Sequence, residues 1–306
     1  MIMKTKAILL GTAALMFVLT SEKAIAQIGT PYIHDPSTIM ECDGKYYTFG
    51  TGGGGLISED GWTWNGGAVR PGGGAAPDAV KIGDRYLVAY SATGGGLGGG
   101  HSGKVLTMWN KTLDPNSPDF KYTEPIEVAS SVNDEDCDAI DAGLLLDPTD
   151  GRLWLSYGTY FGFIRLVELD PATGKRMEGN KEIDIAIDCE ATDLIYRDGW
   201  YYLLGTHGTC CDGPNSTYNI VVGRSRKVTG PYVDNMGRKM LEGGGNPWRG
   251  MLYGMTGRSP RVDNGPLWKL WDSFGMQHSE MIGYWVKDNP VKTNSEKTLA
   301  TIYRHT

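Results

Sequence analysis

Residues 35–50 read DPSTIMECDGKYYTFG: an acidic start, a short apolar strand, an Asp-Gly turn and a strand rich in aromatic residues. Such a dipeptide between two apolar runs predicts a tight β-hairpin. The same layout returns three times further along the chain. The other segments are AAPDAVKIGDRYLVAYS (75–91), DAGLLLDPTDGRLWLSYG (141–158) and EATDLIYRDGWYYLLGT (190–206).

The spacing of these hairpins indicates the architecture. Their turns begin at residues 43, 83, 150 and 198, so successive turns lie 40, 67 and 48 residues apart. A hairpin that recurs at such intervals predicts a β-propeller, in which four-stranded blades surround an axis. A β-sandwich also supplies many short strands, but it does not predict this periodic register. Further strands are expected in VLTMWNKTL (105–113), IRLVELDP (164–171) and YNIVVGRS (218–225).

Composition agrees with an all-β chain. The 306 residues include 44 glycines and 15 prolines, which favour turns, and helical periodicity is hard to find after the first segment. Acidic residues outnumber basic ones by 36 to 29, giving a net charge of −7, and there is no long basic run. This charge pattern argues against a nucleic-acid partner.

The first 26 residues have the pattern of a cleaved signal peptide. A Lys-bearing start precedes an apolar run over residues 7–20 and a small-residue site at Ala24-Ile25-Ala26. No Cys follows this site, so we expect no lipid anchor there, and the apolar run is too short for a typical membrane-spanning helix; we therefore expect no membrane anchor. The pattern predicts a secreted or periplasmic protein that begins near Gln27, with propeller blades over 27–242 and a divergent C-terminal part over 243–306.

The cysteines leave their pairing open. There are five, an odd number, and their spacing resembles no zinc ligand set. Cys210 and Cys211 can form a strained vicinal disulfide or remain two neighbouring thiols. The full set is Cys42, Cys137, Cys189, Cys210 and Cys211.

Three repeats carry a carboxylate at nearly the same position. Asp35 and Glu190 lie eight residues before their turns and Asp141 lies nine before its turn, whereas Ala75 occupies this position in the second repeat. In a propeller these positions meet at one mouth of the central channel. Acidic residues before strands are also common turn formers, but agreement among three repeats favours a functional site.

Convergent carboxylates fit glycoside hydrolysis. One carboxyl group acts as an acid and a second as a base, and a neighbouring negative charge raises the pKa of the acid. Metal binding is the alternative, but the sequence has no calcium loop with closely spaced acids. A Ser-His-Asp triad lacks a nucleophile elbow around any serine.

Four segments together resemble glycoside hydrolase family 43, most closely its endo-1,5-α-L-arabinanases. The resemblance covers about residues 29–242 and implies a five-bladed β-propeller that hydrolyses α-1,5-linked L-arabinan with inversion. It also implies a monomer that requires no cofactor for the chemistry, with possible calcium in the central channel. The segments are IHDPS (33–37), DAIDAGLLLDPTDGRLWLSYG (138–158), EATDLIYRDGWYYLL (190–204) and HGTCCDGPNSTYNIVVGRS (207–225).

The resemblance assigns a role to each carboxylate. It implies that Asp35 is the general base that activates water and that Glu190 is the general acid. Asp141 would tune the pKa of Glu190 and orient it. These are the same three residues that the turn spacing selects, although both arguments use the same sequence.

Six further residues are candidate substrate-binding positions. His34 adjoins the proposed base, and His207 and Cys210 lie in a segment that the resemblance places along the cleft; a structural loop held by a Cys pair is the alternative. Tyr160 and Phe161 can form an aromatic sugar platform or pack at a strand end. Arg224 can orient a carboxylate or be a surface cation.

Two departures from the family pattern keep alternatives open. Ala75 stands where family members usually have Trp, and no Gly-Pro-Gly-His element begins a fifth blade after residue 242. His278 can substitute for the cation ligand of that element, but an ordinary surface or core histidine is the favoured interpretation. Residues 243–306 can therefore be a divergent or incomplete fifth blade, an altered reading of the gene or a poorly folded tail. The alternatives to endo-cleavage are an exo-acting arabinofuranosidase or β-xylosidase, and a non-catalytic arabinan-binding propeller.

Overall fold

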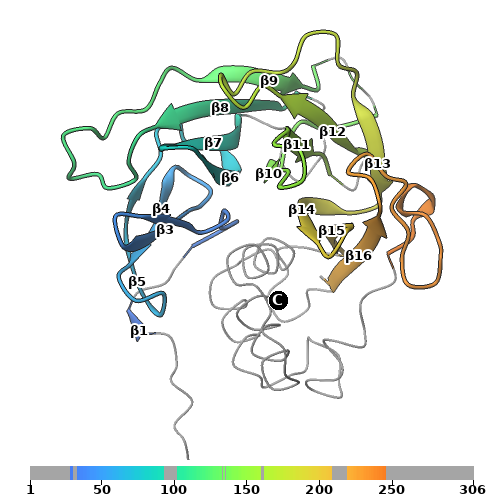
Figure 1. The fold of residues 1–306 in the computed structure, drawn as a ribbon, viewed down its shortest axis with the longest axis horizontal. Coiled ribbons are helices and arrows are strands. Elements are labelled where there is room, and N and C mark those ends of the chain that lie inside the picture. Colours follow the sequence, from blue (N-terminus) through green and yellow to red (C-terminus); the bar gives the residue numbers. More distant parts are fainter. Residues whose placement is uncertain are drawn as a thin grey trace, which may run out of the picture.

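The described part of the chain forms four antiparallel β-sheets around a common centre (Figure 1). The structure is a computed structural model, and the sheets are the blades of a propeller, numbered here 1 to 4 in chain order. The described residues are 28–29, 33–92, 102–132, 134, 136–159, 162–208 and 219–245.

Blades 1 and 2 each contain a four-stranded meander that begins at the centre. In blade 1 the strands are β2 (Met40–Cys42), β3 (Lys45–Phe49), β4 (Gly54–Ser58) and β5 (Thr63–Val69), and β1 (Ile28–Gly29) pairs in parallel with the outer edge of β5. In blade 2 they are β6 (Ala75–Ile82), β7 (Arg85–Ala92), β8 (Lys104–Asn110) and β9 (Ile126–Ser130).

Blades 3 and 4 repeat the arrangement. Blade 3 contains β10 (Gly143–Leu146), β11 (Leu153–Tyr157), β12 (Phe163–Leu169) and β13 (Ile183–Ile187). Within its described residues, blade 4 contains β14 (Glu190–Arg197), β15 (Trp200–His207) and β16 (Asn219–Ser225). Val233 then forms isolated bridges with Arg224 and Lys239, and a 3₁₀ turn follows at Met240–Glu242.

The four predicted hairpins are confirmed as the two innermost strands of the blades: β2–β3, β6–β7, β10–β11 and β14–β15. The three further segments form β8, β12 and β16. The all-β propeller is therefore confirmed. The count of five blades stays a prediction, since residues 246–306, including His278, lie outside the described residues, as does the predicted signal peptide.

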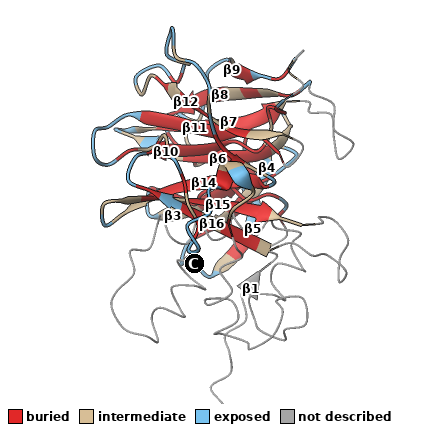
Figure 2. Cartoon of the chain, turned by 90° about the vertical axis from the view of Figure 1, so that its right-hand side faces the viewer, coloured by how far each residue is buried: buried red, intermediate tan, exposed pale blue. Residues whose placement is uncertain are grey.

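The packing between blades is apolar. One buried cluster joins blades 1 and 2, a second joins blades 2 and 3, and a third joins blades 3 and 4. Figure 2 shows buried residues running along the strands of all four blades. Among the described cysteines, Cys42, Cys137 and Cys189 are buried free thiols, and none of the described helices is long and apolar enough to span a membrane.

The backbone refines the alignment of the repeats by one residue. Asp35, Ala76, Asp141 and Ala191 share a left-handed conformation at the entrance to the inner strand, with φ between 39° and 57°. Glu190 therefore lies one residue before the position that Asp35 and Asp141 occupy. The reason is a register shift, which follows Ala75 in blade 2 and Glu190 in blade 4.

Candidate active site

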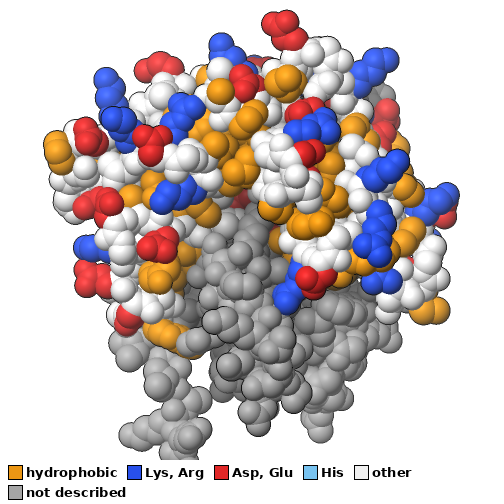
Figure 3. All heavy atoms as spheres, viewed as in Figure 1, with side chains coloured by type: hydrophobic (Ala, Val, Ile, Leu, Met, Phe, Trp, Pro, Cys, Tyr) orange, Lys and Arg blue, Asp and Glu red, His pale blue; other side chains and the backbone are white. Residues whose placement is uncertain are grey.

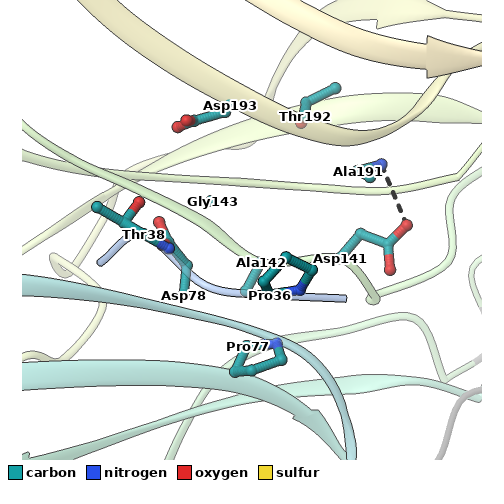
Figure 4. A pocket seen from close by; sticks show the side chains of 10 residues that line it. All are labelled: Pro36, Thr38, Pro77, Asp78, Asp141, Ala142, Gly143, Ala191, Thr192 and Asp193. Carbon is teal, nitrogen blue, oxygen red and sulfur yellow. Dashed lines mark hydrogen bonds between the residues drawn. The ribbon is translucent and has the colours of Figure 1, made fainter. Parts of the chain in front are cut away.

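Three carboxylates from three blades lie close enough to interact, and one of them, Asp141, lines a pocket. Asp35 precedes β2, Asp141 precedes β10 and Glu190 is the first residue of β14; each is less than a tenth exposed. The residues that follow them, Pro36, Ala142 and Ala191, all line the pocket (Figure 4). The structure therefore brings together three side chains that are separated by more than 150 residues of sequence.

The pocket lies between the inner strands of the blades and has an empty volume of about 260 Å³. Strand β6 contacts β2 and β10, and β10 contacts β14, so the inner strands surround it in chain order. Its lining residues are Pro36, Thr38, Pro77, Asp78, Asp141, Ala142, Gly143, Ala191, Thr192 and Asp193. Figure 3 shows hydrophobic side chains gathered toward the centre of one face, with many charged side chains toward its rim.

Burial and mutual repulsion favour the protonated forms of two of these acids. Burial raises the pKa of Glu190 from its ordinary 4.5 to about 7, and the nearby charge of Asp35 contributes. The pKa of Asp141 lies well above its ordinary value because of burial first, then the charges of Glu190 and Asp35. The backbone N–H of Ala191 donates to Asp141 Oδ2 at 3.1 Å, which opposes this shift (Figure 4). The site therefore contains a carboxylic acid that is poised to give up a proton near neutral pH.

Asp35 is held by two neighbouring side chains. Thr51 Oγ1 donates a hydrogen bond to Asp35 Oδ2 at 2.5 Å, and His34 Nε2 lies 3.0 Å from the same oxygen. Thr51 Oγ1 also accepts the backbone N–H of Ala76 at 2.9 Å. The hydroxyl of Thr51 therefore connects the carboxylate of blade 1 to the entrance of blade 2.

A similar contact joins the later blades. The N–H of Asp141 donates to Ser91 Oγ of blade 2 at 3.1 Å, as the N–H of Ala191 does to Asp141 of blade 3. Three of the four left-handed entrance residues, Ala76, Asp141 and Ala191, thus donate a backbone N–H to a side chain of the preceding blade. The sequence analysis missed Thr51 and Ser91. The one sequence feature that could have indicated Thr51 and Ser91 is a hydroxyl residue near the end of the second strand of each hairpin. Such residues are common in ordinary strands.

The other predicted binding residues are placed differently. The side chain of His34 is half exposed beside Asp35. His207 ends β15 next to Thr206, the residue that pairs with Glu190, and its Nε2 lies 3.3 Å from Asp188 Oδ2. His34 and His207 are therefore near the carboxylates.

Arg224 lies away from the three carboxylates. It pairs with Tyr202, toward the opposite end of β15, and its exposed guanidinium stacks over Trp200 at 4.3 Å. Tyr160, Phe161 and Cys210 lie outside the described residues.

The predicted channel calcium stays a prediction. Among the residues that the structure describes, no group of three or more His, Cys, Asp or Glu side chains is arranged to hold a metal ion.

Comparison with known proteins agrees with the propeller fold. The model described as glycosyl hydrolases family 43 matches residues 47–251, and the model described as glycoside hydrolase 123, C-terminal domain, matches residues 263–306. The chain is 34% identical to a solved exo-1,5-α-L-arabinanase from a bovine ruminal metagenomic library, with a TM-score of 0.65 over 71% of this chain and 78% of that one.

Two curated relatives share shorter stretches. An extracellular exo-α-(1→5)-L-arabinofuranosidase of Cellvibrio japonicus is 32% identical over 56% of this chain and 53% of its own length. An extracellular endo-α-(1→5)-L-arabinanase of Bacillus subtilis is 42% identical over 39% of this chain and 38% of its own length. The chain thus matches about half of the first relative and less of the second.

The family model spans two-thirds of the sequence, including strands of all four blades and two of the three clustered carboxylates. The chain therefore belongs to glycosyl hydrolases family 43.

Proposed function

We propose that this chain hydrolyses α-1,5-linked L-arabinan, cleaving internal bonds with inversion at the anomeric carbon. The observation that carries the proposal is the buried Glu190, whose pKa is raised to about 7 beside Asp35 and Asp141. The arabinan-directed names of the three relatives support the choice of substrate.

The proposed reaction divides the work among the three carboxylates. Glu190 donates its proton to the glycosidic oxygen as the bond from this oxygen to the anomeric carbon breaks. Asp35 accepts a proton from a water molecule, whose oxygen bonds to the anomeric carbon from the opposite face. Asp141 would orient Glu190 and tune its pKa; the two acids interact, since the charge of Glu190 raises the pKa of Asp141.

The remaining parts of the proposal concern the sugar-binding surface, the ring and export. We assign His34 and His207 to contacts with sugar hydroxyls, since both are partly exposed next to the carboxylates. A fifth blade built from residues after 242 would complete the ring, and the family model extends to residue 251. Two relatives are named extracellular, which supports export of this chain. We also propose that the exported protein is a monomer that acts on polysaccharide.

Exo-cleavage is the second candidate. It is favoured by the names of the Cellvibrio japonicus relative and of the ruminal structure, both of which are exo-acting enzymes. The two modes of cleavage differ in their first products, because internal cleavage releases oligosaccharides and chain-end cleavage releases a single small product.

The deciding experiment is incubation of the full-length protein with debranched linear arabinan. We expect arabino-oligosaccharides early in the reaction, and proton NMR of the new reducing ends should show inverted configuration. Release of one small product from the start would support exo-cleavage. Binding without products would overturn the proposed activity and support a binding module.

Glu190→Gln tests the role of the acid in the same assay. We expect this variant to retain binding and lose cleavage. Glu168→Gln is the matched control, since Glu168 lies on β12 and pairs with Arg152 away from the pocket. Unchanged turnover in Glu190→Gln would remove Glu190 from the role of acid.

A further inference from the structure

Asp78 joins two blades other than its own. It lies on the inner strand β6 of blade 2 and is 5% exposed. Its Oδ1 accepts the backbone N–H of Thr38 in blade 1 at 2.8 Å, and its Oδ2 accepts the backbone N–H of Leu144 in blade 3 at 2.7 Å. Figure 4 shows the side chain of Asp78 lying next to Thr38. One buried carboxylate therefore bridges the inner strands of blades 1 and 3.

Both bonded amides lie close to the proposed catalytic machinery. Thr38 follows Asp35 by three residues, and Leu144 follows Asp141 by three. The segment after Asp35 is stiff, because Pro36 fixes its own φ and the N–H of Ser37 donates to Phe49 O at 2.7 Å. A movement of Thr38 is therefore transmitted to Asp35.

Glu190, the third carboxylate, is connected to Asp141 through the backbone of the next residue. The N–H of Ala191, the residue after Glu190, donates to Asp141 Oδ2. Gly143 allows β10 to approach β14 closely, since a Cβ at Gly143 would lie 2.3 Å from Thr192 O. Blades 3 and 4 therefore hold Asp141 and Glu190 together, whereas Asp78 sets how blade 1 sits relative to this pair.

We propose that Asp78 is a positioning residue that fixes the separation of Asp35 from Asp141 and Glu190. The inference rests on the proposed function, in which a base and an acid act on opposite sides of one bond. A misplacement of about 1 Å in such an arrangement costs about 100-fold in rate. Asp78 would then act on turnover through backbone amides, without contact with the sugar.

Two substitutions perturb the bridge in different ways. Asp78→Asn keeps the shape but places an amide NH₂ where one oxygen accepts an N–H, so one bridge is lost. Asp78→Glu keeps the charge and both acceptors but lengthens the side chain, which pushes the segments apart. For both variants, we expect kcat per folded molecule to fall about 10- to 100-fold on linear arabinan, with KM within about threefold of the parent value.

Asp147→Asn is the matched control. Asp147 is also a buried carboxylate between blades, and its Oδ2 accepts the hydroxyl of Tyr201 at 2.7 Å. It lies in the β10–β11 turn, at the end of β10 away from Asp141. We expect this variant to lose thermal stability while kcat per folded molecule and KM stay at the parent values.

The pKa of Glu190 provides a test of the positioning role that does not depend on enzymatic activity. In Asp78→Glu, weaker repulsion from a displaced Asp35 should lower the pKa of Glu190 by about half a unit or more, as followed by ¹³C NMR of its carboxyl group. The charge at position 78 is unchanged in this variant, so the shift reports spacing. Among the described residues, Asp141 and Cys189 also interact with Glu190, and Asp188 and His207 lie beyond Cys189.

The outcomes separate the two proposals. A parent protein without cleavage products would overturn the proposed function, and the NMR titration would still decide the role of Asp78. A parent-like kcat in the two Asp78 variants with an unshifted Glu190 titration would overturn the positioning role. If both variants failed to fold while Asp147→Asn folded, Asp78 would be required for stability alone, and the inference would also fall.

Discussion

Removing the ionisable group of Glu190 should stabilise the protein at alkaline pH. The pKa of this carboxyl is raised from 4.5 in an ordinary environment to about 7 in the fold, first by burial and then by Asp35. Stability that depends on its proton is complete below pH 4.5 and is lost as the pH rises to 7. At about 1.4 kcal/mol per pKa unit, the shift corresponds to about 3 kcal/mol. The side chain of Gln in Glu190→Gln cannot ionise, so the variant should not lose this stability as the pH rises.

The assay is urea denaturation of parent and variant between pH 4 and pH 8. We expect the difference in unfolding free energy between Glu190→Gln and the parent to grow by about 3 kcal/mol in favour of the variant over this range. The variant also removes a charge that raises the pKa of Asp141. The measured difference therefore includes the coupling between the two acids.

Glu168→Gln provides a control of opposite sign. The Arg152 guanidinium holds the pKa of Glu168 below its ordinary value, so the contribution of this carboxylate is present above pH 4.5 and is lost as the pH falls. Glu168→Gln should therefore be less stable than the parent at pH 8 and approach it in acid. A difference between Glu190→Gln and the parent that stays constant from pH 4 to pH 8 would refute the assignment of a buried, proton-holding Glu190.

Three further substitutions test the surroundings of the site. Thr51→Val removes the hydrogen bond to the proposed base, so we expect kcat on linear arabinan to fall about 10-fold or more with little change in KM. Thr51→Ser keeps the hydroxyl and should retain activity. Equal kinetics for the two variants would contradict a role of this hydrogen bond. Gly143→Ala places a methyl group against Thr192 O, and urea denaturation should report a loss of about 1–3 kcal/mol. Tyr201→Phe removes the hydroxyl that donates to Asp147 Oδ2, although Thr149 still donates to Oδ1, so the unfolding free energy should fall by about 1–3 kcal/mol while kcat is unchanged.

The inner hairpins could be predicted because the residues that determine each hairpin lie close together in the sequence. Asp43-Gly44 and Asp198-Gly199 adopt positive φ at both residues, which matches the turns that join antiparallel strands directly. The aromatic strand after each turn supplies the apolar face that packs between blades. Repetition of this signal was sufficient to indicate a propeller and to select Asp35, Asp141 and Glu190.

Contacts between blades could not be predicted in the same way. Asp78 lies 40 residues after Thr38 and 66 before Leu144, and no local pattern indicates that it accepts hydrogen bonds from both. Arg224 shows the converse: its charge suggested a carboxylate partner, but strand pairing places it over Trp200. The one-residue offset of Glu190 also depends on a bulge that turn spacing does not reveal.

The side chains near the axis alternate in size, and this alternation explains how one aspartate can serve two blades. Two residues after the left-handed entrance position stand Ser37, Asp78, Gly143 and Asp193 in blades 1 to 4. Asp78 can reach the amides on both sides because its neighbours at this level are a serine and a glycine. A large side chain at Gly143 would meet the backbone of β14 and separate Asp141 from Glu190. The spacing of the carboxylates therefore depends on small residues as well as on acidic ones. A search for catalytic residues by chemical type alone would overlook these small residues.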